Sequence, residues 1–209
     1  KVKLILNLSN YYKDKLSNEH IESLVDLLIL THPNIPDGHA LKAEILISED
    51  NLEAAGNELI LVLEKEKENY LIWEQLIAID SELGNNEEMY KHSKEAISYF
   101  PNYPKFLLFN GFACGKTNRI EEGIKILDIG ADLVIDQPEL EAQFYTSIAE
   151  LYYGKGEIEK AFSYYDKAIR VNPTNPVTLN NYSYYLSLEK KDPEKAIRMA
   201  KLAVEIAPQ

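Results

Sequence analysis

The sequence has little cysteine, glycine or proline and no long apolar run, and these shortages exclude several classes of protein. Cys114 is the only cysteine, so the chain forms no internal disulfide and holds no cysteine-cluster metal site. No apolar run approaches the ~18 residues that would suggest a membrane span. The nine glycines and nine prolines lie mostly at or near the boundaries of predicted helices. Apolar residues make up 45% of the chain, which is enough for a continuous core and argues against global disorder.

Basic residues are also scarce. Lysine and arginine number 22 against 34 aspartates and glutamates, which gives a formal net charge of −12. Nucleic-acid affinity requires basic patches that neutralise phosphates, so we expect no nucleic-acid partner. The simplest interpretation of the acidity is solubility. The chain begins at Lys1 rather than methionine and shows no signal sequence, so we expect a fragment of a longer protein whose compartment the sequence does not indicate.

Residues 142–175 form the most regular stretch, and they predict two short amphipathic helices joined by a tight turn. Gly154 and Gly156 end the first helix, because glycine weakens helix interiors and is favoured after a helix C-terminus. Pro173 ends the second helix. The apolar residues of each helix recur at helical spacing: Tyr145, Ile148, Ala149 and Tyr152 in the first, then Ala161, Tyr165, Ala168 and Ile169 in the second. Such a hairpin cannot bury both faces alone and needs neighbours.

These residues resemble the tetratricopeptide repeat, whose pattern is W-x2-L-G-x2-Y, then A-x3-F, then P, with a period near 34 residues. Tyr145 stands for the leading tryptophan and Ala149 for the glycine, so the size class is kept at both places. The resemblance implies an all-α fold, a right-handed superhelical solenoid of antiparallel helix pairs. It also implies that each repeat contacts mainly its neighbours.

The same pattern, with departures, predicts one array of six repeats over residues 1–209: 2–35, 36–69, 70–103, 104–141, 142–175 and 176–209. The fourth repeat is four residues longer, and we place the excess near Asp136 to Pro138, where the next helix can begin with proline. In the first repeat, the second helix is predicted to start near Ser17 or Asn18. The sixth has one residue inserted near Lys190 to Pro193. An unrelated helical bundle would explain neither this phase nor the recurring boundary prolines.

No motif in the chain predicts catalysis, a cofactor or a metal. Gly111 to Thr117 approaches the phosphate-binding loop G-x4-G-K-[ST], but it has one residue too few and falls where a helix is expected. The four histidines lack ligand spacing, and no nucleophile motif is present. The charged run Glu64 to Glu68 is interpreted as a solvated helix face. Cys114 is expected on a buried helix face, as a small hydrophobe.

In this family, one face of the first helices lines a concave groove, and the resemblance places a partner-binding site there. Some members hold a peptide's C-terminal carboxylate with lysine, arginine and asparagine, but here Glu44, Glu74 and Glu150 dominate the charge and Lys116 stands alone. The predicted partner-binding groove comprises Glu44, Glu74, Gln75, Phe109, Phe112, Lys116, Glu150, Tyr153, Asn180, Asn181 and Tyr184, and the aligned positions also include Ala78 and Thr146. An alternative for Phe109 and Phe112 is packing against a neighbouring repeat.

The predicted function is a non-catalytic protein-interaction scaffold, part of a longer repeat protein. Its partner is expected to be a protein or peptide segment with apolar and basic residues. Two alternatives stay open: a regulatory module of an enzyme whose catalytic domain lies outside these residues, and a module that self-associates through the solenoid ends.

Overall fold

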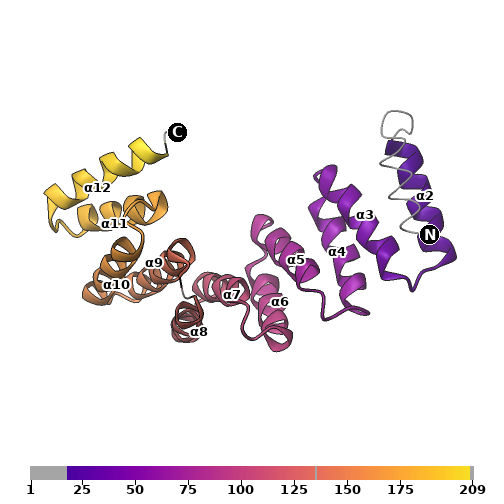
Figure 1. The fold of residues 1–209 in the computed structure, drawn as a ribbon, viewed down its shortest axis with the longest axis horizontal. Helices are drawn as coiled ribbons and strands as arrows, with labels where there is room; N and C mark the ends of the chain where they lie inside the picture. The colour runs from indigo at the N-terminus through magenta and orange to yellow at the C-terminus, as the bar shows by residue number, and fades with distance from the viewer. Residues whose placement is uncertain (1–17, 135, 208–209) are drawn as a thin grey trace. The chain divides into compact units, whose positions relative to one another are not determined.

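The computed structural model describes residues 18–134 and 136–207, and every regular element in that part of the chain is an α-helix (Figure 1). Consecutive helices pack as pairs, α3 with α4 and so on to α11 with α12. The all-α class is therefore confirmed, whereas the predicted first helix of the first repeat lies outside the described residues. The helices are α2 (Asn18–Thr31), α3 (Pro36–Ser48), α4 (Leu52–Leu63), α5 (Tyr70–Glu82), α6 (Asn86–Tyr99), α7 (Pro104–Lys116), α8 (Ile120–Leu133), α9 (Pro138–Gly154), α10 (Ile158–Val171), α11 (Pro176–Leu188) and α12 (Pro193–Ile206).

Contacts divide the chain into two compact units, Lys1–Tyr99 and Phe100–Gln209. The first unit contains α2 to α6 and the second contains α7 to α12.

One turn geometry joins the two helices of every pair. A residue with positive φ follows each first helix: Asp50 (61°), Gly84 (71°), Asn118 (59°), Gly156 (79°) and Lys190 (53°). The next residue then donates its backbone N–H to the carbonyl five residues earlier, as Arg119 does to Cys114 at 2.8 Å. This is the Schellman arrangement, which satisfies carbonyls that the helix end leaves free. Glycine signals the turn in only two of the five pairs.

Proline begins five of the described helices, because its fixed φ suits the first turn and its missing N–H is not needed there. Helix α9 begins at Pro138 and has 17 residues, against 13 in α7 and α11. The four extra residues thus lengthen α9 by about one turn, at the place that the sequence indicates. Helix α2 begins at Asn18, as predicted.

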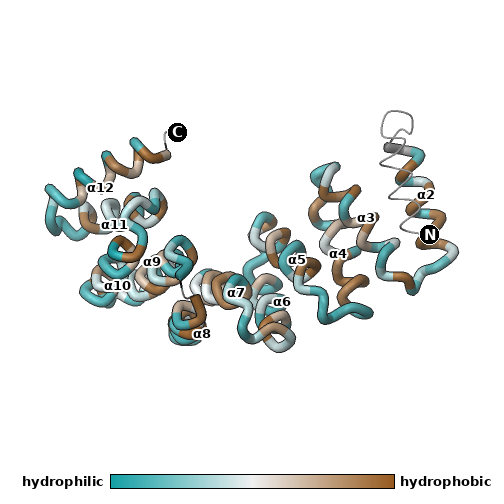
Figure 2. Tube along the Cα trace, viewed as in Figure 1, coloured by the Kyte–Doolittle hydropathy of each residue, from teal (hydrophilic) through white to brown (hydrophobic). Residues whose placement is uncertain are grey.

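Apolar residues recur along each helix among hydrophilic ones (Figure 2), and the cores form where the apolar sides meet. In the second unit, Tyr165 lies at 0% exposure in a cluster with Phe162, Tyr182 and Met199. Small residues let helices approach closely: a Cβ at Gly111 would lie 2.3 Å from Leu127. Gly111 stands where the pattern of the fourth repeat expects a small residue, and the contact with Leu127 makes that small size a steric requirement.

In the first unit, Met89 stands where the repeat pattern has alanine and Ile77 where it has a small residue, and both are accommodated inside the core. Met89 and Ile77 are buried at 1% and 0% exposure. His39, which replaces an aromatic residue, has its Nδ1 2.6 Å from Glu58 and its Nε2 3.1 Å from the carbonyl of Pro33. Both partners accept hydrogen bonds, so both bonds together require the doubly protonated imidazolium.

The interpretation of Glu64 to Glu68 as a helix face is wrong. Helix α4 ends at Leu63, and the run forms the turn that leads to α5. The side chains are exposed to solvent as expected, but the carbonyl of Lys67 accepts a hydrogen bond from Trp73 Nε1 at 2.8 Å. The turn is thus tied to the core of the first unit.

Candidate partner-binding surface

The first helices of the pairs in the second unit are α7, α9 and α11, and α9 contacts both of the others. Eight of the predicted groove residues lie on these helices, and we call them the first-helix surface: Phe109, Phe112, Lys116, Glu150, Tyr153, Asn180, Asn181 and Tyr184. The remaining three belong to the first unit. Glu44 is exposed on α3. On α5, Glu74 is half-buried and Gln75 is exposed.

A hollow of about 190 Å³ opens between α7 and α9, and three predicted residues line it: Phe112, Lys116 and Glu150. Phe112 is 41% exposed, and Lys116 Nζ lies 5.1 Å from the centre of its ring. A cation over a ring face is attracted by the ring's negative face. Gly111 and Gly115 of α7 and Leu151 of α9 also line the hollow.

Glu150 is the half-buried carboxylate of this surface. Asn181 donates its side-chain N–H to Glu150 Oε1 at 2.6 Å, and Asn180 donates in turn to Asn181 Oδ1 at 3.3 Å. The second bond orients the Asn181 amide toward the carboxylate. Burial raises the pKa of Glu150, while the bond from Asn181 and the charge of Lys116 oppose that rise. A cation placed beside Glu150 would therefore relieve an incompletely compensated charge.

Tyrosines continue the surface from α9 to α11. The rings of Tyr153 and Tyr185 have centres 3.9 Å apart, and Tyr184 meets Tyr185 edge-on at 5.3 Å. The Tyr153 hydroxyl donates to Glu189 Oε1 at 2.8 Å, and this bond with the negative charge of Glu189 and partial burial raises the pKa of Tyr153 to about 12. Tyr184 is 58% exposed and so offers apolar area to a partner.

Sequence reasoning missed Tyr185 and Glu189. Tyr185 lies four residues after Asn181, so helical spacing puts it on the same face and could have found it. Glu189 follows the last residue of α11, where helix periodicity no longer predicts direction. Its role was visible only in the folded chain.

Tyr165 lies behind this surface with its hydroxyl buried and without a hydrogen-bond partner in the described residues. Burial and the nearby charge of Glu150 raise the pKa of Tyr165, which therefore stays neutral. A buried polar group without a partner is costly and rare.

One of the aligned positions, Thr146, is buried rather than exposed. Thr146 is buried at 6% exposure, and its hydroxyl is 2.7 Å from that of Thr178 between α9 and α11. Phe109 is half-buried on α7. The segment from Gly111 to Lys116 is part of helix α7, so its amides cannot wrap an anion as a phosphate loop does. Cys114 is buried, as predicted.

Within residues 18–134 and 136–207, no group of three or more histidine, cysteine, aspartate and glutamate side chains could hold a metal ion. No helix in these ranges is long and apolar enough to cross a membrane.

Two family models, both described as tetratricopeptide repeat, match residues 142–175 and 164–198. The first match has the same bounds as the repeat predicted from Tyr145, Tyr152 and Pro173. Residues 142–198 therefore carry the tetratricopeptide repeat signature. A search of curated proteins finds no match.

Solved structures share the tetratricopeptide repeat fold at low sequence identity. MamA residues 41–end from Desulfovibrio magneticus RS-1 is 16% identical with a TM-score of 0.66, covering 83% of this chain and 96% of that one. PilF from Pseudomonas aeruginosa is 18% identical with a TM-score of 0.64, covering 99% and 92%. YrrB, described as a protein with an unusual peptide-binding site, is 17% identical with a TM-score of 0.59, covering 88% and 93%.

Proposed function

We propose that this tetratricopeptide repeat chain is a protein-interaction scaffold whose first-helix surface binds a peptide segment with apolar and basic side chains. The observation that carries the proposal is the hollow between α7 and α9, where exposed Phe112 lies beside the half-buried carboxylate of Glu150. The peptide-binding site named for YrrB supports binding of this kind on the shared fold.

Phe112 and Tyr184 supply the apolar part of the recognition. Their side chains are 41% and 58% exposed, so a partner can bury much of each ring. Aromatic residues are enriched among those that contribute most to interfaces, at about 2 kcal/mol or more for central ones. Phe112 borders the hollow and is the better candidate for the central anchor.

Glu150 supplies the charge preference. Its pKa is raised chiefly by burial, and Lys116 is held over the Phe112 ring. A lysine or arginine from the partner, placed beside Glu150, would gain an ion pair in a partly desolvated place. Charge complementarity of this kind mainly sets partner choice and association rate.

The test compares capture of basic and acidic peptide pools by the parent protein, Phe112→Ala and Tyr184→Ala. The parent should prefer basic peptides, and Phe112→Ala should weaken their capture by about tenfold or more, which corresponds to about 1.4 kcal/mol. Ile129→Ala is the matched control, because Ile129 is 53% exposed on the second helix α8 and also loses apolar area. Unchanged capture in Phe112→Ala, or a preference for acidic peptides, would refute the proposal.

We further propose that the helix pairs of both units are repeats of one array and that these residues perform no catalysis. Helices α3, α5, α7 and α11 begin at residues 36, 70, 104 and 176, the predicted repeat starts, which supports the array. The mass in solution, measured at several concentrations, distinguishes the two: it stays constant for this scaffold and rises with concentration for a self-associating module.

A further inference from the structure

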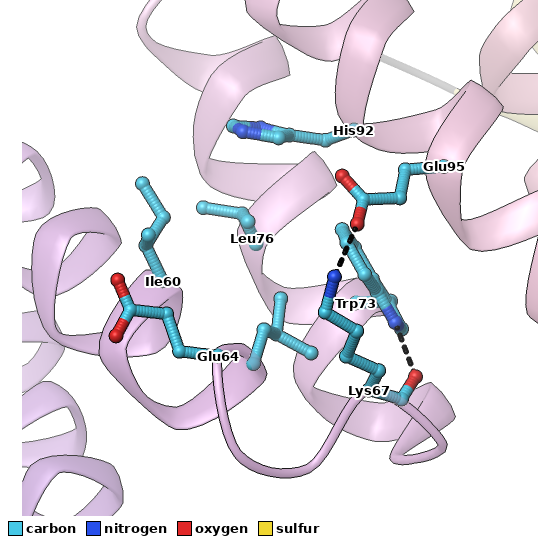
Figure 3. A pocket seen from close by; sticks show the side chains of 8 residues that line it. Ile60, Glu64, Lys67, Trp73, Leu76, His92 and Glu95 are labelled. Carbon is cyan, nitrogen blue, oxygen red and sulfur yellow. Dashed lines mark hydrogen bonds and ion pairs between the residues drawn. The ribbon is translucent and has the colours of Figure 1, made fainter.

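The first unit contains a pocket that the first-helix surface does not include. It lies among the end of α4, the turn after it, α5 and α6, and its open volume is about 150 Å³. The lining residues are Ile60, Leu63, Glu64, Lys67, Trp73, Leu76, His92 and Glu95 (Figure 3). An apolar cavity of this volume in another protein holds benzene, so one leucine- or phenylalanine-sized side chain fits.

The floor of the pocket is apolar and held in place. Trp73 is 2% exposed, donates to the carbonyl of Lys67, and stacks on Tyr99 with ring centres 6.3 Å apart. Leu63 and Leu76 are buried at 4% and 2% exposure, whereas Ile60 is 39% exposed at the mouth. A preformed apolar site loses little conformational entropy when a side chain enters it.

The rim of the pocket is acidic on balance. Lys67 Nζ pairs with Glu95 at 3.3 Å, and both side chains are nearly half exposed, so this pair adds little stability. Across the pocket from that pair (Figure 3), Glu64 makes no side-chain hydrogen bond or ion pair with the described residues. His92 lies 2.7 Å from the buried carboxylate of Asp80, which already occupies its Nδ1. The carboxylate left for a ligand is therefore that of Glu64.

We propose that this pocket is a second docking site, which takes one apolar side chain of a partner peptide with a lysine or arginine beside it. The apolar side chain rests on Trp73, Leu63 and Leu76, and the basic group pairs with Glu64. Complementarity to the acidic rim selects basic peptides over acidic ones. The site lies wholly within the first unit, so it holds or fails independently of the first-helix surface.

Trp73 makes the test direct, because it is the only tryptophan of the chain and its ring forms part of the pocket. The probes are acetylated, amidated heptapeptides. One is Gly-Lys-Lys-Phe-Lys-Lys-Gly, one has serine in place of phenylalanine, and one has glutamate in place of every lysine. The first should change tryptophan emission saturably, and each of the others should bind about tenfold more weakly or less.

Glu64→Lys reverses the charge at the rim of the pocket, and Ile60→Ser removes the apolar side chain at its mouth. Glu53→Lys is the matched control, because Glu53 is exposed in the first turn of the same helix α4 and the change in net charge is the same. We expect Glu64→Lys and Ile60→Ser to weaken binding of the basic phenylalanine peptide by about tenfold in titrations followed by Trp73 emission, and Glu53→Lys by no more than about twofold. Circular dichroism checks that each variant keeps its helices.

Four results would overturn the proposal: no saturable change in emission, equal binding of the acidic peptide, equal loss in Glu53→Lys and Glu64→Lys, or full affinity in Ile60→Ser. Phe112→Ala, which alters only the second unit, should leave the Trp73 signal unchanged. A loss of that signal in Phe112→Ala would also count against a separate site.

Discussion

Gly111→Ala is the sharpest test of the packing between α7 and α8. Gly111 is buried in the middle of α7, and an added Cβ would lie 2.3 Å from both Cγ and Cδ2 of Leu127. Leu127 is fully buried, and the contact with Cγ involves the branch point of its side chain, so a rotation of the terminal methyl groups does not relieve it. Either the leucine or the helix must move.

The two opposing contributions to stability are known in size. Overpacking a core costs about 1 to 3 kcal/mol, and this contact belongs near the upper end because three atoms of Leu127 would be too close to the added Cβ. Replacing glycine by alanine inside a helix gains about 1 kcal/mol. The net loss in the free energy of unfolding is therefore about 2 kcal/mol, which corresponds to a melting temperature lower by about 4 to 8 °C.

Gly154→Ala is the matched control, because Gly154 ends helix α9 without a positive φ and a Cβ there would meet nothing within 4 Å. It should raise the melting temperature, by at most about 4 °C for a gain of about 1 kcal/mol. Thermal unfolding followed by circular dichroism compares both variants with the parent. If Gly111→Ala is as stable as Gly154→Ala, the close approach of α7 and α8 is refuted.

Three further predictions concern single side chains. Burial opposes the charge of His39, but the bonds to Glu58 and Pro33 and the charge of Glu58 together raise its pKa above 6.5. The stability that this raised pKa adds is fully present below the pKa of the unfolded chain and is lost as the pH rises through the pKa of the folded protein. The free energy of unfolding in urea should therefore decline above pH 6.5, and His39→Gln should abolish that decline. Tyr165→Phe should stabilise the protein by about 1 kcal/mol in urea unfolding, because it removes a buried hydroxyl without a partner; a clear loss of stability would contradict this. Cys114, which is buried, should react slowly with a thiol reagent in the native protein and rapidly in urea, whereas a fast native reaction would show that the helices packed against α7 do not cover it.

Much of the fold was predictable from local pattern. Apolar spacing and boundary prolines indicated the helix pairs, and the family match over residues 142–175 confirms the clearest of them. The third repeat shows why the pattern tolerates change: Ile77 and Met89 are both fully buried, so volume and apolarity matter more than identity at these positions. Turns at Asp50 and Asn118 gave no glycine signal, because these residues can also adopt positive φ.

The sequence by itself determined the class of the fold and the helix starts at Pro36, Pro104, Pro138 and Pro176, because these follow from spacing and boundary residues along one helix. Only the tertiary structure decided which side chains meet. Asn181 reaches Glu150 across 31 positions, and Tyr153 reaches Glu189 across 36. The pocket around Trp73 likewise joins three helices and a turn that the sequence presented as a solvated charged run. Such contacts depend on how the helices pack against one another, and that packing is determined jointly by residues that are far apart along the chain.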